Sequence, residues 1–490
     1  DLTVCRKDAP GAPAAARGGT GVRETADSLP SLRSDRLLAT IAAMTEPASS
    51  LSRRTLLKTA AVALPAAGAV STLTKTAAAQ DGAVPNSPVR PVATTGQTPT
   101  RAAGGHPGVI VRQWEPRNLE YPLPSLDGPI TPTEQFYVRS HFPVPEADAK
   151  TWTLTVNKWN GPIRFGNPEY EELTLTLADL EALGTEEKTV TMECAGNGRI
   201  FLVPKPSGLL WETGGVGTAV WKGTPLRLVL EKFGVEPPEG QGNSSGSGAF
   251  SAYQQMRDKN GTRIFGVPNS HVMLRGADNG KLSKYPAPLH YNRGLPMAKA
   301  LDDVLLATHM NGESLPPHHG YPLRAIVPGW YGAASVKWLD KITVTNEPDN
   351  GFFSTFDYAT FVKTPAGEQL TPLTGMQVKS ALARPARGER VKAGQPFTCR
   401  GVAWAGEEAI EKVEFSADGG ENWAEATLID KPQPQIWTRW RFDWTPPQPG
   451  DFTLMSRATD AAGNVQPPAH DPLRRAYMVN FTVPVQVEAV

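Results

Sequence analysis

The sequence has 490 residues, of which 49 are lysine or arginine and 49 are aspartate or glutamate. The formal net charge is zero, which argues against a bulk attraction to nucleic acid or to an anionic membrane surface. The length indicates two or three domains, and 46 glycines with 46 prolines predict many loops. Cys5, Cys194 and Cys399 form no C-x-x-C pair, so we expect no disulfide framework, zinc knuckle or C-x-x-C-H haem attachment site.

Two stretches of the first 107 residues are expected to lie outside the folded domains. Residues 1–43 are a low-complexity extension rich in alanine, arginine and glycine, without an initiating methionine, so we expect translation to start at Met44. Residues 80–107 are rich in proline, threonine and glycine, which predicts a disordered linker.

Between these stretches, residues 44–79 carry the pattern of a twin-arginine signal peptide. Arg53 and Arg54 are followed by a short apolar stretch and by three alanines at the end of the segment. A membrane anchor needs about 20 strongly apolar residues, and this stretch is too short. We therefore predict a periplasmic or otherwise exported protein with no membrane span in its mature chain.

Residues 108–370 are predicted to form one α+β domain. Alternating apolar side chains over 151–159 indicate a half-buried strand. Segments 176–184 and 225–234 both end at glycine and are predicted to be short helices. Further strands are expected at 189–194, 269–276, 322–329 and 335–344, and a surface loop at 240–249.

Cys194 lies where a buried strand is predicted to break. Val190, Met192 and Cys194 share one face of a period-2 run, and the following AGNG supplies glycines and an asparagine that tolerate positive φ. Inward-pointing N–H groups in such a turn form an anion-binding concavity, and a thiolate at its edge suits a transition metal. A free cysteine is also a common core residue, so these residues alone leave both interpretations open.

Residues 371–490 change character to short alternating runs at regular spacing with turn residues between them. This spacing predicts an antiparallel β-sandwich of immunoglobulin type. Cys399 lies in one of the runs and is expected to pack in the sandwich core.

Several motifs occur together in the order found in one enzyme family. They are ECAGN followed by Arg199, FYVRSHFPVP at 136–145, WETGGVGTAVWKGTPL at 211–226, MNGESLPPHHGYPLRAIVPGWYGAASVKWLDKITV at 310–344 and FDYATF at 356–361. This set resembles the molybdopterin domain of the sulfite oxidase family, and the rest of the chain resembles that family's dimerisation domain. The resemblance covers about 109–490. It implies a mixed α/β molybdopterin-binding domain of the sulfite oxidase fold, followed by an immunoglobulin-like β-sandwich dimerisation domain.

The resemblance implies a molybdenum-molybdopterin oxidoreductase in which Cys194 is the metal ligand. The implied reaction is the oxidation of sulfite to sulfate. Because no haem is expected in this chain, the electrons are expected to pass to a separate acceptor: a c-type cytochrome, another soluble carrier or dioxygen. The C-terminal domain implies a homodimer, and neither nucleic acid nor a membrane is an expected partner.

An oxyanion substrate needs fixed cations, and the planar, permanently charged guanidinium of arginine suits this task. The resemblance puts Arg139, Arg199, Trp211, Tyr358 and Arg475 at the substrate. Arg139 and Arg199 are expected to hold the oxyanion, while Trp211 is equally interpretable as core packing. The match at Arg475 is loose, and Arg474 is an equal alternative from the sequence.

The resemblance also implies a long polar clamp for the pterin. Its residues are Tyr137, Arg139, Ser140, His141, Asp278, His319, Arg324, Ser335, Val336 and Lys337. Arg324 and Lys337 are the expected phosphate partners. Ser140 and Ser335 stand where the animal enzymes carry asparagine and histidine, and Gly198 stands where they carry an arginine. The change at Gly198 lowers the positive charge of the expected pocket and leaves the identity of the substrate open.

Three alternatives to a sulfite enzyme stay open on the sequence. A sulfane-sulfur dehydrogenase subunit shares the two-domain layout and the export route, but acts on sulfur attached to a carrier protein. A periplasmic methionine-sulfoxide reductase shares the cysteine ligand, although the C-terminal sandwich argues against it. An exported binding protein that has lost its cofactor is the non-enzymatic alternative.

Overall fold

A computed structural model describes residues 108–158, 172–235 and 271–490, except 283, 284, 286 and 346. The predicted extension, signal peptide, linker and 240–249 loop lie outside the described residues. Within the described ranges, no helix is long and apolar enough to cross a membrane.

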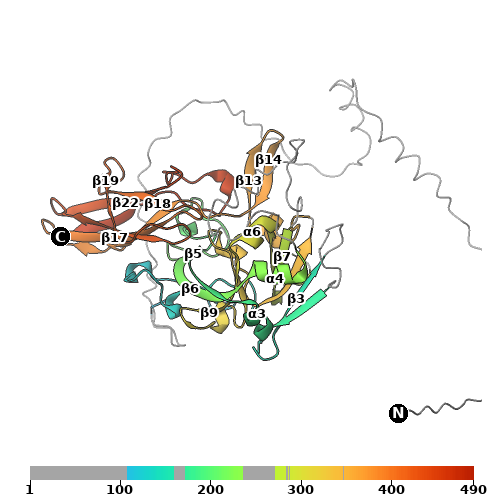
Figure 1. Cartoon of the computed structure of the whole chain (residues 1–490). Helices are drawn as coiled ribbons and strands as arrows, with labels where there is room; N and C mark the ends of the chain where they lie inside the picture. Colours follow the sequence, from blue (N-terminus) through green and yellow to red (C-terminus); the bar gives the residue numbers. More distant parts are fainter. Residues whose placement is uncertain (1–107, 159–171, 236–270, 283–284, 286, 346) are drawn as a thin grey trace, which may run out of the picture. The chain divides into compact units, whose positions relative to one another are not determined.

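Two five-stranded sheets carry the first part of the described chain (Figure 1). The first has the order β10-β9-β6-β5, with β11 also paired to β9. Its strands are β5 (Glu186–Glu193), β6 (Val216–Pro225), β9 (Leu305–Met310), β10 (Glu313–Ser314) and β11 (Arg324–Ile326). All of their pairings are antiparallel.

The second sheet has the order β4-β3-β12-β7-β8. Its strands are β3 (Thr153–Lys158), β4 (Glu172–Thr176), β7 (His271–Gly280), β8 (Leu289–Pro296) and β12 (Leu339–Thr345). Strand β12 pairs with β3 in parallel and with β7 in antiparallel orientation, so the sheet is mixed. The predicted α+β class is confirmed.

Within the described ranges, three short helices accompany these sheets: α3 (Leu177–Leu183), α4 (Leu226–Phe233) and α6 (Met297–Asp302). A capping box in which the side chains of Thr176 and Asp179 bond each other's backbone N–H groups begins α3. Gly234 ends α4 in the left-handed region with φ 96°, which glycine adopts without a Cβ clash. The buried positions of α4 have the spacing of one helix face: Leu226, Val229, Leu230 and Phe233.

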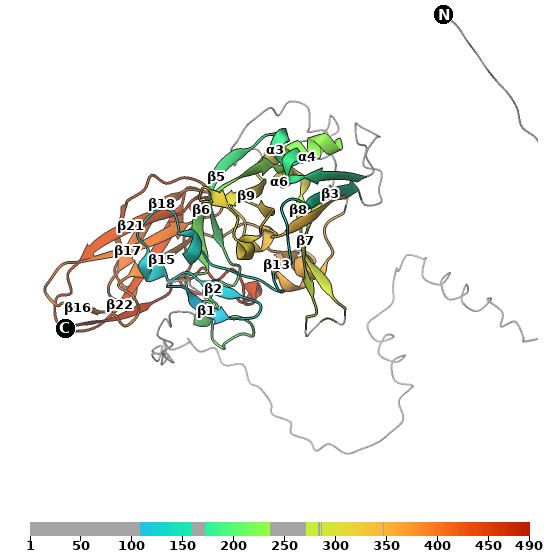
Figure 2. The same cartoon turned by 90° about the horizontal axis from the view of Figure 1, so that it is seen from below.

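Residues after Met376 form two stacked sheets (Figure 2). One consists of β15 (Lys379–Arg384), β17 (Phe397–Trp404), β21 (Thr438–Trp444) and β20 (Thr427–Leu428). The other consists of β16 (Arg390–Val391), β23 (Val485–Ala489), β22 (Gly450–Asp460), β18 (Ile410–Ser416) and β19 (Ala424–Glu425). Cys399 is fully buried between them, which confirms its predicted place in the core.

The prediction of a strand at 335–344 is wrong for its first four residues. Strand β12 begins at Leu339, and the chain before it leaves the single 3-10 turn η7 (Gly332–Ala334). Trp338 has φ 51°, a left-handed conformation that interrupts a strand and stores strain at this point. Residues 335–338 therefore follow an irregular path, and the side chains of Ser335 and Lys337 line a cavity.

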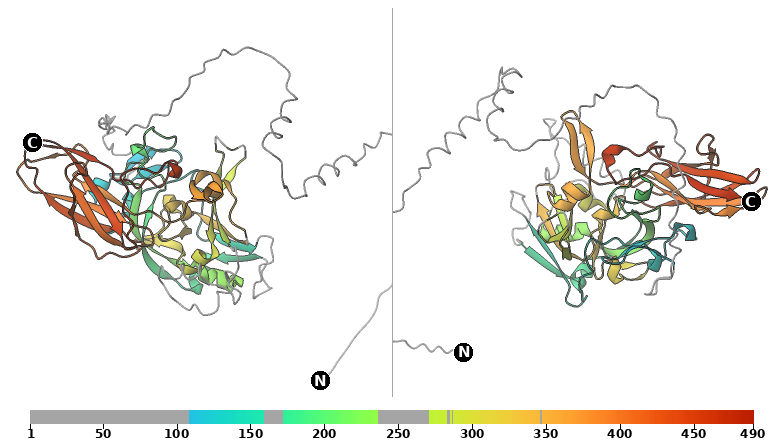
Figure 3. Two further views of the ribbon diagram at one scale, coloured as in Figure 1. Left: turned by 90° about the horizontal axis from the view of Figure 1, so that it is seen from above. Right: turned by 180° about the vertical axis from the view of Figure 1, so that it is seen from behind.

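Two hairpins outside the larger sheets were not expected from the sequence. The first pairs β1 (Ile110–Gln113) with β2 (Asn118–Glu120). The second pairs β13 (Ala359–Thr364) with β14 (Gly367–Pro372), crosses the predicted domain boundary after residue 370, and stands away from both sheets (Figure 3). Every residue of β14 is exposed, so its sequence lacks the alternation of apolar and polar side chains that indicates a half-buried strand.

Candidate functional site

Cys194 directly follows β5 and is only 6% exposed. Its N–H donates to the Gly215 carbonyl at 2.7 Å, and its own carbonyl accepts from the Asn197 N–H at 2.8 Å, which closes a turn. Gly198 takes φ 93° in this turn. Asn197 tolerates a positive φ but does not adopt one here; its Oδ1 accepts from the Gly215 N–H at 3.0 Å. The asparagine therefore holds the turn through its side chain.

Arg199 follows the turn, and its guanidinium contacts two backbone carbonyls and one aromatic ring. Its Nε donates to the Ala476 carbonyl at 3.0 Å, and its Nη1 to the Leu209 carbonyl at 3.3 Å. The guanidinium carbon lies 4.9 Å from the ring centre of Tyr477. A Cβ at Gly196 would lie 2.6 Å from Nη2, so the approach of this arginine requires glycine. Part of its orientation is thus set by the C-terminal segment.

Two cavities meet at Cys194. The clamp cavity is lined, among others, by Tyr137, Asp278, His319, Arg324, Ser335 and Lys337. The mouth cavity is lined, among others, by Arg199, Trp211, Asp357, Arg475 and Tyr477. Both cavities share Arg139, Ser140, His141, Cys194 and Tyr358. The thiol therefore lies at the junction of a polar interior space and a space that bears three arginines.

The structure separates the two rival arginines near the C-terminus. Arg475 lines the mouth cavity, and its Nη1 donates to the carbonyls of Phe356 at 2.9 Å and Ala359 at 3.0 Å. Arg474 lines a different cavity and donates to the Asn480 Oδ1 at 2.7 Å. Of the pair, the geometry brings Arg475 to Cys194 and Arg139.

Aromatic and histidine side chains form the wall of the mouth cavity beside Arg139. The Tyr358 hydroxyl lies 3.0 Å from the Nε2 of His141. Burial, reinforced by the charge of Arg139, lowers the pKa of His141 to about 3, so its ring is neutral near pH 7. Trp211 is 1% exposed and packs edge-on to Tyr137 at 6.3 Å, so it is both a core residue and part of the cavity wall.

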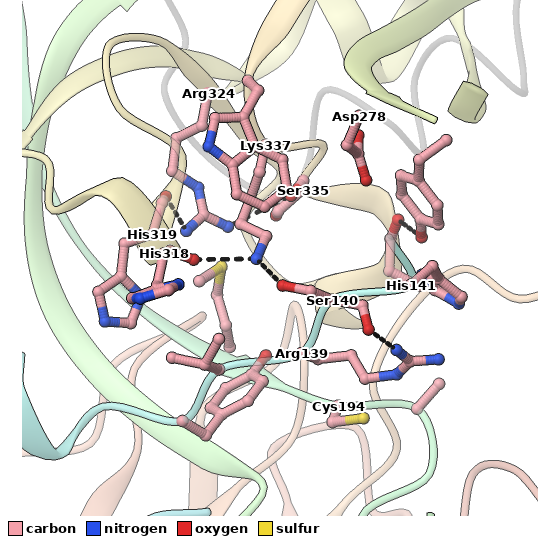
Figure 4. Close-up of a pocket in the computed structure, with 18 of the residues that line it drawn as sticks. Arg139, Ser140, His141, Cys194, Asp278, His318, His319, Arg324, Ser335 and Lys337 are labelled. Atoms are coloured by element: carbon pink, nitrogen blue, oxygen red, sulfur yellow. Dashed lines mark hydrogen bonds between the residues drawn. The ribbon is translucent and has the colours of Figure 1, made fainter. Parts of the chain in front are cut away.

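Lys337 is the central cation of the clamp cavity (Figure 4). Its Nζ donates to the Ser140 Oγ at 2.8 Å and to the His318 carbonyl at 2.9 Å. Burial lowers the pKa of Lys337 well below its usual value, and the neighbouring charge of Arg324 adds to this. Burial raises the pKa of Asp278 to about 7, against the opposing charge of Lys337. An additional anion near Lys337 and Arg324 would stabilise both cations.

Arg324 is the second buried cation of the clamp cavity. Its Nη1 donates to the His319 carbonyl at 2.8 Å and its Nη2 to the Ser335 carbonyl at 3.2 Å. Its guanidinium carbon lies 4.9 Å above the ring of Trp221. Val336 is fully buried and is absent from the cavity lining, while its backbone pairs with Ala325. Of the predicted clamp residues, Val336 thus contributes no side chain to the space.

The donors and acceptors of the clamp cavity fit a phosphorylated pterin. Among the described residues, the Asp278 Oδ1 and the Arg324 Nε are buried without a hydrogen-bond partner, although both residues line the cavity. Such atoms are costly unless a bound group satisfies them. The described ranges hold no cluster of three or more His, Cys, Asp or Glu side chains able to bind a metal.

Several residues of the site escaped the sequence prediction. Asn118 Oδ1 accepts from the Ser140 N–H at 2.9 Å, and the Tyr291 ring stacks on His141 at 4.8 Å. Glu193, next to Cys194, is 2% exposed. Glu193 could have been found from the sequence, because a charged residue within a predicted buried strand is unusual and needs a partner. No local pattern marks Asn118 or Tyr291.

Comparison with family models divides the chain in the same two parts. The model of the oxidoreductase molybdopterin binding domain matches residues 141–353. The model of the Mo-co oxidoreductase dimerisation domain matches residues 371–488.

Individual relatives agree with these matches. The chain is 32% identical over 382 residues to the sulfite oxidase of Arabidopsis thaliana, covering 74% of this chain and 88% of that protein. It is 32% identical over 386 residues to the mitochondrial sulfite oxidase of Homo sapiens, covering 75% of this chain but 63% of the human protein. The chain thus spans less than two thirds of the length of its mammalian relatives. The crystal structure of the sulfane dehydrogenase SoxCD from Paracoccus pantotrophus is similar with a TM-score of 0.61 and 25% identity, covering 81% of this chain and 94% of that chain.

Proposed function

Because the chain belongs to the sulfite oxidase family, we propose that it is a molybdenum-dependent oxidoreductase that converts sulfite to sulfate. The observation that carries this proposal is the mouth cavity, where Arg139, Arg199 and Arg475 surround the approach to Cys194. A small oxyanion must lose its water to enter, and three fixed guanidinium groups replace that hydration. One carboxylate, Asp357, shares the cavity and leaves an excess of positive charge.

The cofactor proposed for the clamp cavity is molybdenum-molybdopterin. When bound, its metal would supply the two-electron oxidation chemistry. Cys194 would hold the metal through its thiolate, and Lys337 and Arg324 would bind the pterin phosphate. Burial raises the pKa of the Cys194 thiol, while Arg139 and Arg199 oppose that effect. The two arginines therefore favour the thiolate form that a metal requires.

The protein groups around the substrate orient it and limit water. Arg199 is restrained by the carbonyls of Ala476 and Leu209, so it needs little reorganisation when the oxyanion arrives. The buried Tyr358 and Trp211 reduce the water near the reacting sulfur. The Tyr358 hydroxyl lies 3.0 Å from His141 Nε2, and it can donate a hydrogen bond to a substrate oxygen when His141 Nε2–H is the donor of that pair.

The remaining parts of the proposal concern partners and location. The electrons would leave to a separate acceptor, most simply a c-type cytochrome. The given sequence has no C-x-x-C-H motif for a covalently attached haem. The match of 371–488 to a dimerisation domain supports a homodimer. The arginine pair at Arg53 and Arg54 supports export to the periplasm through the twin-arginine route.

Oxidation of sulfur held on a carrier protein is the second candidate function. Two observations favour it: the similarity to a sulfane dehydrogenase structure, and a mouth cavity of about 560 Å³, far larger than one sulfite ion. A carrier-bound sulfur would reach Cys194 on an extended arm through this cavity. Sulfite remains the first choice because the arginines match a small, highly charged anion better than a neutral sulfur chain.

A direct assay tests both candidates. Purified protein of known molybdenum content is given sulfite with ferricyanide, cytochrome c or oxygen in parallel, and a protein-bound persulfide with the same acceptors. Sulfite-dependent reduction that saturates and scales with molybdenum supports the proposal. Turnover of the persulfide carrier without turnover of sulfite would transfer the assignment to the second candidate.

A further inference from the structure

We propose that Lys379 and Trp404, both in the C-terminal sandwich, are positioning residues for Cys194 that act through Glu193 and Asn197. This inference rests on the proposed function in treating Cys194 as the metal ligand. It gives the sandwich a direct part in the site, separate from any part in dimerisation.

Glu193 receives a donor from the sandwich on each of its carboxylate oxygens. Lys379, at the start of β15, donates from Nζ to Oε1 at 2.8 Å. Trp404, at the end of β17, donates from Nε1 to Oε2 at 2.9 Å. The side chains of Lys379 and Glu193 are 2% and 3% exposed, so this ion pair is shielded from water. Two donors at fixed angles define the position of the carboxylate and of the backbone that carries it.

Asn197 links this carboxylate to the far side of the cysteine turn. Its Nδ2 donates to the Glu193 Oε1 at 3.0 Å, and its carbonyl accepts a second bond from Lys379 Nζ at 3.2 Å. Its Oδ1 accepts from the N–H of Gly215, whose carbonyl in turn accepts from the Cys194 N–H. One lysine therefore bonds the residue before the cysteine and the residue three positions after it, so it restrains the turn at both ends.

The presence of a buried ion pair does not by itself show that the pair stabilises the fold. Apolar side chains of similar volume often replace such a pair without loss, whereas a pair with several directional bonds fixes geometry. The Lys379 network reaches directly into the turn between Cys194 and Arg199. Displacing a reacting group by about 1 Å can cost on the order of 100-fold in rate, so such restraint has kinetic value.

The chain offers a matched control in Lys299. This lysine is 1% exposed, and its Nζ bonds Asp303 at 3.0 Å and Glu407, a residue of the sandwich, at 2.6 Å. It is thus a buried lysine that also joins the two parts of the chain, but it lines neither the clamp cavity nor the mouth cavity. Removing it tests the loss of a buried contact between the two parts without touching the cysteine turn.

The test compares Lys379→Met, Lys299→Met and the double variant Glu193→Gln with Lys379→Met. Each full-length, molybdenum-loaded protein is measured for thermal unfolding, metal content, sulfur-to-molybdenum charge-transfer absorption per bound metal, and sulfite kcat and KM. Lys379→Met is expected to shift the absorption and to lower kcat roughly 10- to 100-fold, with a smaller change in KM. A folded Lys379→Met protein that has lost its molybdenum would also support the inference, because a displaced Cys194 would then no longer hold the metal.

Lys299→Met is expected to lower the unfolding temperature while its absorption and kcat stay those of the wild type. The double variant removes the unpaired buried carboxylate, so it should regain stability yet keep the shifted absorption. The inference is overturned if Lys379→Met has wild-type absorption and kcat, or if Lys299→Met produces the same shifts. Should the wild type fail to oxidise sulfite, the proposed substrate fails, and the absorption comparison still decides the role of Lys379.

Discussion

Replacement of Arg199 by glutamine tests the oxyanion site most sharply. The Nε and Nη1 of Arg199 are engaged with the carbonyls of Ala476 and Leu209. The hydrogen bonds of Arg199 to the described residues use Nε and Nη1, which leaves Nη2 to the substrate. Losing one charge-assisted hydrogen bond costs about 2 to 3 kcal/mol, which lowers kcat/KM for sulfite roughly 30- to 150-fold. Lysine should recover only part of the loss, because it lacks the planar fork.

The assay is steady-state sulfite oxidation with ferricyanide, normalised to bound molybdenum. Arg474→Gln is the matched control: this arginine is adjacent to Arg475 but lines a different cavity. Its loss should lower the unfolding temperature through the contact with Asn480 and leave the sulfite KM unchanged. Equal kinetics in Arg199→Gln and wild type, at equal metal content, would refute the assignment of the mouth cavity as the oxyanion site.

Three further predictions concern the clamp, the mouth cavity and the pH dependence of stability. Lys337→Met should lower the molybdenum content of purified protein by removing a phosphate partner; full metal content would contradict its place in the clamp. Tyr358→Phe removes the hydroxyl that lies 3.0 Å from His141 but keeps the buried ring, so kcat should fall about tenfold while the protein stays folded, with a lower unfolding temperature because His141 loses a buried partner. Burial, with the charge of Asp303, raises the pKa of Asp302 to about 6, so its ionisation destabilises the fold as pH rises from about 4 to 6. Asp302→Asn should therefore unfold at a higher temperature than wild type at pH 7, with the gap closing near pH 4; a pH-independent gap would contradict this.

Elements with strong local signals were predictable from the sequence. Helix α3 has the capping box of Thr176 and Asp179, and α4 has apolar residues at helical spacing. Helix α6 (Met297–Asp302) has six residues, too few to show a period, and it was missed. The hairpin of β13 and β14 was missed because its strands are largely exposed and alternate weakly.

The site was predictable where residues lie within motifs and unpredictable where distant segments meet. The motif around Cys194 identified the cysteine and Arg199, but not the bonds that Asn197 makes to Glu193 and Gly215. The network through Lys379 joins residues 186 positions apart, which no local pattern encodes. The same limit left Arg474 and Arg475 as equal candidates from the sequence, because the partners that separate them, Asn480 for Arg474 and the carbonyl of Phe356 for Arg475, come from other segments.

The central claim is that the thiolate of Cys194 holds molybdenum. X-ray absorption at the molybdenum edge of purified wild type and Cys194→Ser tests it most directly, because it counts the sulfur atoms around the metal independently of turnover. Cys194→Ser should stay folded, and its metal should lose one sulfur neighbour, since a serine oxygen is a poor substitute for a thiolate. Superimposable spectra from the two metal-loaded proteins would contradict it.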